Sequence, residues 1–303
     1  MNSIGFAVPA LACDCHTHVF PDDSRFPFSS TRKYTPPFAG VAQLQAMLER
    51  LDLQRVVVVQ PSVYGSDNAA TLHAVHALGL ARARAVAVIE DASTDAELDA
   101  LHKAGVRGVR LNLEMLAESD PVRCEAIVRH TAAQIAGRGW HIQIYSQLKL
   151  VAALADVFGE LDLPVVLDHF ARASAQGGLA QPGLSVVLEL VRAGCAYVKL
   201  SAPYLCSAAA PRHIDLDEIA HALVEANPQR MLWASNWPHP NPSHGPLAGP
   251  ARVSQPQPVD DAEELGLLAR WAPSAAVRNR ILVDNPIALY GFDATITVAS
   301  QPG

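Results

Sequence analysis

Short apolar runs, several of them rich in valine and isoleucine, alternate with amphipathic stretches along most of the chain. The runs predict buried strands, and apolar residues spaced three and four apart predict helices. The predicted strands are 10–19, 55–62, 83–90, 105–113, 140–146, 163–170, 196–202 and 230–237, and predicted helices include 68–80, 95–105, 124–139, 148–161 and 184–194. Strands and helices that alternate over about 250 residues indicate a single α/β domain (1–303), a (β/α)8 or TIM barrel. A doubly wound sheet with a second domain is the alternative, but no linker interrupts the middle of the chain.

The first predicted strand ends in the sequence DCHTH, residues 14–18. The period of two in a strand places Asp14, His16 and His18 on one face, and the two cysteines and Thr17 on the other. Two neutral imidazoles in one space suggest metal ligands or a proton relay. The structural alternative is a pair of polar residues at a strand end, hydrogen-bonded to backbone.

Polar residues also end most of the other predicted strands. In a TIM barrel these ends form the catalytic face, and long loops that follow them shape the pocket. Two such loops, 20–40 and 238–261, are rich in proline, glycine and serine. The polar residues at the strand ends are Ser62, Arg110, Asn112, Gln143, Tyr145, Asp168, His169, Lys199, Ser201, Ser235 and Asn236.

The composition limits the classes of molecule that we expect the protein to bind. The formal charge of −7 and the absence of any lysine and arginine cluster argue against nucleic-acid and anionic-membrane surfaces. No stretch is long and apolar enough to cross a membrane, and the first residues lack the basic region of a signal peptide, so we expect a cytoplasmic protein with a small-molecule substrate. The five cysteines include no C-x-x-C pair, so we expect no disulfide framework or zinc knuckle. The oligomeric state has no signature in the sequence.

Four motifs carry a family resemblance. DCHTH, DHF (168–170), SNWPHPN (235–241) and NPIALYGF (285–292) resemble the amidohydrolase superfamily in its amidohydrolase-2 branch. Within that branch, FPFSSTRKYTP, VVVVQPSVYGSDNAATL and GVRGVRLNL resemble the family of 2-pyrone-4,6-dicarboxylate lactonases and related sugar lactonases. The resemblance covers about residues 11–292. It implies a TIM barrel that opens a lactone ring with an activated water.

The resemblance also implies site residues. His16, His18 and His169 match the family's pocket histidines and are the candidate metal ligands, and Asn236 stands where the family usually has an aspartate general base. The positions that match substrate-binding residues are Tyr34, Ser62, Arg110, Tyr145 and Asn241. Pyrone lactonases work without a divalent metal, whereas several relatives use one. We therefore expect no required cofactor, with zinc at the three histidines as the alternative.

Asn236 departs from the family pattern, because an amide does not accept a proton at neutral pH. A metal held by His16, His18 and His169 could replace the base by lowering the pKa of a bound water. His239 or His169 could instead be the base. A third explanation is an asparagine introduced in place of the aspartate to trap a bound substrate.

A second departure concerns substrate charge. Leu116 and Leu205 occupy positions where the family has arginines, and leucine does not replace an arginine fork on a carboxylate. We therefore expect a lactone less acidic than a pyrone dicarboxylate, with Arg110 holding one oxygen. Two other functions remain open: a metal-dependent decarboxylase of an aromatic or unsaturated acid, and a ligand-binding homologue with impaired catalysis.

Overall fold

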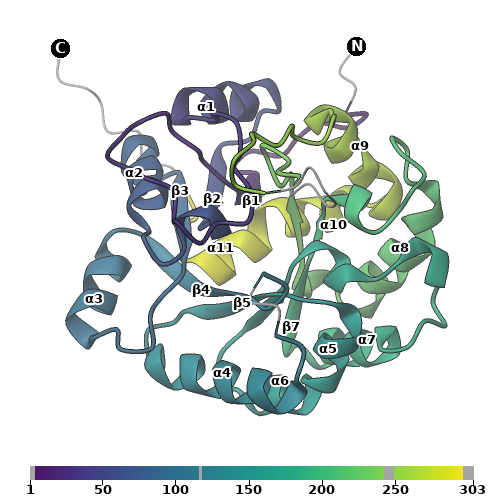
Figure 1. Cartoon of the computed structure of the whole chain (residues 1–303). Helices are drawn as coiled ribbons and strands as arrows, with labels where there is room; N and C mark the ends of the chain where they lie inside the picture. Colours follow the sequence, from purple (N-terminus) through teal and green to yellow (C-terminus); the bar gives the residue numbers. More distant parts are fainter. Residues whose placement is uncertain (1–3, 116–117, 242–248, 296–303) are drawn as a thin grey trace.

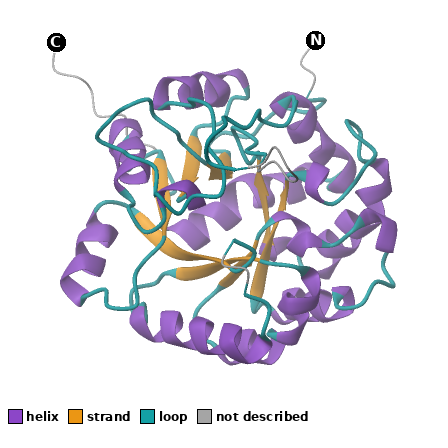
Figure 2. Cartoon of the chain, viewed as in Figure 1, coloured by secondary structure: helices purple, strands orange, loops and turns teal. Residues whose placement is uncertain are grey.

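Eight parallel strands form one sheet in the order of the chain, surrounded by helices (Figures 1 and 2). The structure, a computed structural model, describes residues 4–115, 118–241 and 249–295. The first and last strands meet through backbone hydrogen bonds: the His18 amide donates to the Trp237 carbonyl (2.8 Å), and the Asn236 amide donates to the His16 carbonyl (2.9 Å). These bonds close the sheet into the predicted TIM barrel.

The strands follow the predicted runs closely. They are β1 (Cys13–Thr17), β2 (Arg55–Val59), β3 (Ala83–Ala87), β4 (Val106–Asn112), β5 (His141–Tyr145), β6 (Val165–Leu167), β7 (Ala196–Ser201) and β8 (Met231–Ala234). The α-helices are α1 (Val41–Arg50), α2 (Ala69–Leu78), α3 (Asp95–Lys103), α4 (Pro121–Gln134), α5 (Leu148–Ala153), α6 (Ala155–Glu160), α7 (Leu184–Ala193), α8 (Asp217–Ala226), α9 (Asp261–Trp271), α10 (Ala275–Asn279) and α11 (Asn285–Tyr290).

Helix α4 begins before the residue that apolar spacing predicted. Asp120 precedes it and accepts a hydrogen bond from the Val122 amide (3.1 Å), while Pro121 occupies the first helical position. Both residues are favoured there, since a helix start has unsatisfied amides and proline has none to lose. The predicted helix 148–161 is present as two helices, α5 and α6, that meet at Leu154.

The strands alternate between two apolar layers. Val56 and Val58 pack against residues of α1 and α2, and Val57 and Val59 pack inside the barrel with Cys13 and other residues. This alternation is the one expected for strands that are buried on both faces.

Strand β1 contains a bulge that corrects the predicted face assignment. Asp14 pairs with Val56 and Thr17 with Val58, so β1 advances three residues while β2 advances two. An extra residue of this kind reverses the alternation of side chains. Consequently Asp14 and Thr17 share the outer face, whereas the two cysteines pack inside the barrel. The predictions that Asp14 lies on the face of His16 and His18, and Thr17 on that of the cysteines, are therefore wrong. The bulge turns both histidines into the barrel.

Among the described residues, no helix has the length and apolarity needed to cross a membrane. The five cysteines are all free thiols.

Candidate active site

A pocket of about 730 Å³ opens at the C-terminal end of the strands. Its volume is typical of small-molecule sites. The candidate residues that line it are His18, Tyr34, Ser62, Arg110, Tyr145, His169, Asn236 and Asn241. His16 is fully buried and does not line the pocket, although it contacts His18 and His169.

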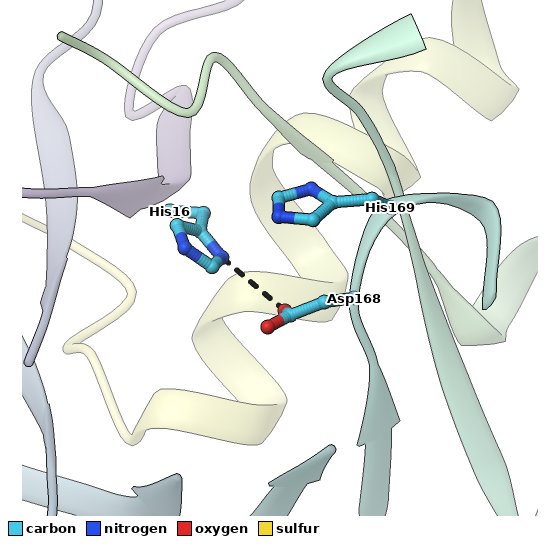
Figure 3. Close-up of side chains that lie close together, drawn as sticks. All are labelled: His16, Asp168 and His169. Atoms are coloured by element: carbon cyan, nitrogen blue, oxygen red, sulfur yellow. Dashed lines mark hydrogen bonds and ion pairs between the residues drawn. The ribbon is translucent and has the colours of Figure 1, made fainter. Parts of the chain in front are cut away.

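His16 is anchored by a polar network inside the barrel. Its Nδ1 lies 3.2 Å from Asp168 Oδ1 and 3.1 Å from Lys199 Nζ (Figure 3 shows the pair with Asp168). Lys199 also donates to Gln143 Oε1 (2.7 Å), and Gln143 Nε2 donates to Asp168 Oδ2 (3.0 Å). The ammonium and the Asp168 carboxylate are 3.2 Å apart, and both side chains are completely buried. A buried ion pair with this many hydrogen bonds holds its members in one geometry.

His18 and His169 each have one ring nitrogen fixed by a neighbour. His18 Nδ1 donates to the Val59 carbonyl (2.7 Å), and His169 Nδ1 lies 2.8 Å from Ser201 Oγ. Burial lowers the pKa of each imidazole from 6.5 to about 3. Burial, assisted by the Lys199 charge, also lowers the pKa of His16 well below its usual value. All three imidazoles are therefore neutral at pH 7, as both a metal ligand and a general base require.

His169 begins a left-handed turn that runs to Arg172. The four φ angles from His169 to Arg172 are +51°, +54°, +52° and +59°. None of these residues is glycine, so each is expected to cost about 1–2 kcal/mol. The turn directs His169 and Arg172 into the pocket, while Phe170 and Ala171 pack in the core. Strain of this kind is often found at functional sites.

Arg110 presents an unused donor in the pocket. Its Nη1 donates to the Gln60 carbonyl (3.1 Å), and its guanidinium lies 5.8 Å from the centre of the Tyr145 ring. Its Nε is buried and lies 4.0 Å from Asp168 Oδ2, an ion-pair contact without a hydrogen bond. Its Nη2 makes no hydrogen bond with the described residues, so the guanidinium can bind an oxygen of a ligand at the pocket wall.

Asn236 follows β8 in a left-handed conformation, with φ of +65°. Its Nδ2 donates to the Tyr204 hydroxyl (2.9 Å). The neighbouring His239 does not line the pocket, and its Nε2 lies 2.9 Å from Asp261 Oδ1. Of the two histidines that sequence offered as a base, His169 is therefore the one in the pocket.

Four further polar residues line the pocket that no motif in the sequence indicates: Lys33, Glu114, Arg172 and Gln257. Arg172 lies three residues after His169, a spacing that indicates a shared face only once the left-handed turn is known. Leu205 lines the pocket as well, whereas Leu116 lies outside the described residues.

The family model for amidohydrolases matches residues 13–292. The chain belongs to the amidohydrolase family. It is 36% identical to a 2-pyrone-4,6-dicarboxylate hydrolase of Comamonas testosteroni, covering 94% of this chain and 92% of that one. It is also 33% identical to a 4-sulfomuconolactone hydrolase of Rhizobium radiobacter, over 95% and 92%. The resemblance to lactone-acting amidohydrolases is thereby confirmed, and the protein is an enzyme.

Two solved structures of amidohydrolase relatives have the same architecture. One, from Pseudomonas putida, is named as a candidate 2-pyrone-4,6-dicarboxylic acid hydrolase; it is 29% identical, with a TM-score of 0.78 over 95% of this chain and 100% of that one. The other, an amidohydrolase of Burkholderia multivorans with zinc bound, is 20% identical, with a TM-score of 0.66 over 94% and 100%. The second similarity concerns the fold alone.

The residues of this amidohydrolase fit a tightly held divalent metal poorly. His16, Asp168 and His169 offer ligand atoms within 4.8 Å of one another, which is close enough for one ion. However, His16 Nδ1 and Asp168 Oδ1 already contact the buried ammonium of Lys199. A divalent ion bound by His16 and Asp168 would lie beside the Lys199 ammonium in a buried site, and Asn236 supplies no compensating carboxylate.

Proposed function

We propose that this amidohydrolase hydrolyses a small lactone bearing one carboxylate, by attack of a water that needs no metal. The observation that carries the proposal is the Arg110 guanidinium in the pocket lining, which donates to the Gln60 carbonyl and keeps Nη2 without a hydrogen bond among the described residues. Charge-assisted bonds from a guanidinium to a carboxylate are strong and directional. The names of the curated relatives, which are hydrolases of a pyrone and of a muconolactone, support a lactone as the scaffold.

Two tyrosines supply neutral donors for the lactone. Burial raises the pKa of Tyr34 and of Tyr145 to about 12, so both hydroxyls keep their protons at neutral pH. We assign Tyr145 to donate to the lactone carbonyl oxygen, where negative charge develops when water attacks. Tyr34 and Asn241, from the loops that follow β1 and β8, are assigned to contact the remainder of the ring.

His169 is the base in this proposal. The Ser201 hydroxyl is directed at the Lys199 carbonyl, so its oxygen accepts the His169 Nδ1 proton and leaves the Nε2 lone pair free. The lowered pKa of about 3 gives this nitrogen a basicity near that of an ordinary aspartate. Asn236 then orients the water through its amide rather than deprotonating it.

The proposed reaction needs no reactant other than the lactone and one water molecule. Water oxygen bonds to the carbonyl carbon while one water proton moves to His169 Nε2. The bond between that carbon and the ring oxygen breaks, and His169 returns the proton to the departing oxygen. The new carboxylic acid loses its proton to solvent, so one proton is released for each ring opened.

The pocket favours one substrate carboxylate over two. Leu205 offers no charge, and Arg172 is already 3.4 Å from the Glu114 carboxylate. The Lys33 ammonium donates to the Met115 carbonyl (2.7 Å). A second substrate carboxylate would lack its own guanidinium, and the loss of one charge-assisted bond costs about 1.5–3 kcal/mol. We expect kcat/KM for a mono-anionic lactone to exceed that for a pyrone dicarboxylate by roughly 10- to 100-fold.

The test measures proton release in weak buffer when the enzyme is mixed with neutral, mono-anionic or dianionic lactones. Each measurement is made before and after the enzyme is treated with a chelator. We expect the mono-anionic lactones to be opened and chelation to leave the rate unchanged. Release of carbon dioxide from an aromatic acid would support the decarboxylase instead. Saturable binding of lactones without any proton release would support a ligand-binding homologue.

A further inference from the structure

The close contact between the His16 and His18 rings requires a proton or a metal ion between them. Their Nε2 atoms lie 3.3 Å apart. A neutral imidazole has one N–H and one lone pair. If both Nε2 atoms carried lone pairs they would repel, so a proton or a metal ion must lie between them. The distance alone does not decide, because two nitrogens on one tetrahedral zinc are also separated by roughly 3.3 Å.

The tautomer of His18 is fixed by its backbone partner. The Val59 carbonyl only accepts, so His18 Nδ1 carries the proton. His18 Nε2 therefore presents a lone pair toward His16. The state of the pair depends entirely on which nitrogen of His16 is protonated.

Two groups compete for His16 Nδ1. Asp168 Oδ1, at 3.2 Å, would accept a proton from Nδ1 and leave a lone pair on Nε2, which is the arrangement of a metal-binding histidine. Lys199 Nζ, at 3.1 Å, would donate to a lone pair on Nδ1 and leave the proton on Nε2. The outcome determines whether the two histidines share a hydrogen bond or a metal.

The hydrogen-bond inventory of Lys199 favours the second arrangement. An ammonium has three N–H groups, and Lys199 Nζ has three contacts: Gln143 Oε1, Asp168 Oδ1 and His16 Nδ1. Asp168 is satisfied without His16, because Oδ1 faces the ammonium and Oδ2 accepts from Gln143 Nε2. Donation to His16 leaves no ammonium hydrogen unpaired in a completely buried position.

We infer that Lys199 donates to Nδ1 of His16, holds the His16 proton on Nε2, and thereby makes the His16–His18 pair a hydrogen bond in place of a metal-binding pair. Lys199 is a positioning residue in this arrangement, since it acts on the pocket through His16. Its charge also opposes a divalent ion at Asp168. The inference goes beyond the proposed function, because it concerns proton placement whatever lactone is bound.

The first test is metal binding, which is independent of turnover. The purified wild type, Lys199→Met and Lys199→Gln are titrated with Co²⁺, and the visible absorption of the bound ion is recorded. We expect no one-equivalent site in the wild type, and about one equivalent in each variant with an affinity at least 100-fold higher. Lys149→Met removes an exposed lysine and is expected to match the wild type. Adding His18→Ala to Lys199→Met is expected to abolish the gain.

The second test needs no variant to fold. The ¹⁵N spectrum of the ring nitrogens of His16 in the wild type is expected to show a protonated Nε2 and an unprotonated Nδ1. A protonated Nδ1, a tight one-equivalent Co²⁺ site in the wild type, or folded Lys199 variants that bind no more Co²⁺ than the wild type would each overturn the inference. Lactone turnover enters none of these measurements, so failure of the proposed function would be seen separately in the proton-release assay.

Discussion

The roles that we propose for His169 and Arg110 depend on nitrogen atoms that make no hydrogen bond with the described residues. His169 Nδ1 lies 2.8 Å from Ser201 Oγ and Arg110 Nη1 donates to the Gln60 carbonyl, whereas His169 Nε2 and Arg110 Nη2 make no hydrogen bond with the described residues. Such groups gain most when a substrate arrives, because the substrate removes the cost of the unmet bond. Substitutions at these two positions are therefore expected to separate catalysis from binding.

His169→Gln is expected to lower kcat by roughly 10²–10⁴-fold, because the variant loses its proton acceptor. KM is expected to change much less, since Arg110 makes the proposed contact to the substrate carboxylate. Steady-state kinetics on a mono-anionic lactone measure both constants. The exposed His130→Gln serves as the control and is expected to leave them unchanged.

The Asn236→Asp change tests whether positions 236 and 169 reach the same water. In the His169→Gln background the new carboxylate is expected to raise kcat at least ten-fold over that of His169→Gln alone. In the wild type it is also expected to raise kcat. A double variant no faster than His169→Gln would show that position 236 does not contact the attacking water.

Arg110→Met is expected to reduce kcat/KM for a mono-anionic lactone by about 10- to 100-fold, mainly through KM. A neutral lactone of the same ring size is expected to lose much less, because it makes no charge-assisted bond. Comparison of the two substrates isolates the charge. Arg123→Met, whose side chain is 74% exposed, is the matched control. An equal loss on both substrates would contradict the assignment of Arg110.

At the scale of elements, two local features orient the side chains of the site: the bulge in β1 and the left-handed turn after β6. The bulge turns His16 and His18 inward together, and the turn directs His169 and Arg172 into the pocket. Both departures from regular geometry lie at the pocket end of their strands. Regular strands at these two places would orient fewer of the same side chains toward the substrate.

The left-handed turn leads to a stability prediction. Ala171→Gly is expected to raise the free energy of unfolding by about 0.5–1 kcal/mol, because relief of the strain at φ of +52° exceeds the extra entropy of glycine in the unfolded chain. Ala126→Gly, on the exposed face of α4, is the control and is expected to lower it by about 1 kcal/mol. Urea unfolding of the three proteins measures both changes. A loss of stability in Ala171→Gly would show that the turn is not strained.

These two elements also mark the limit of prediction from sequence. The eight strands and most pocket residues could be predicted, because burial on both faces produces apolar runs and barrel sites lie where such runs end. The bulge depends on how β1 pairs with β2, and the left-handed turn places alanine and phenylalanine in a conformation that neither prefers. The Lys199 network joins β1, β5, β6 and β7, so no local pattern identifies its pairs.

At the scale of the whole molecule, buried neutral histidines make the fold sensitive to acid. The pKa of His141 falls from 6.5 to about 3 through burial, as do those of His18 and His169. Below pH 6.5 these histidines bind protons in the unfolded chain but not in the folded protein. They therefore lower the free energy of unfolding as the pH falls from 6.5 to 3. Burial raises the pKa of Asp14 to about 7 and that of Glu264 well above its usual value, which opposes this effect over the range from about 7 to 4.

His141 allows the acid effect to be isolated, since it lies inside the barrel and outside the pocket lining. The His141→Leu variant is expected to be less sensitive to acid than the wild type, by about 2 kcal/mol between pH 7 and pH 5. Urea unfolding at several pH values gives this difference whatever the absolute stability of the variant. The exposed His130→Gln is expected to follow the wild type, and an unaltered pH dependence in His141→Leu would refute the prediction.

The hydrogen bonds that close the barrel between β1 and β8 also govern when the enzyme becomes active during its synthesis. His16 is made about 220 residues before Asn236, with roughly 10–45 s between them at ordinary rates of elongation. Through that interval β1 has an unpaired edge, and such an edge invites pairing with other chains. A chain whose synthesis stops before β8 thus has both an unpaired strand edge and an incomplete pocket, so we expect catalysis only once the last strand has joined the first.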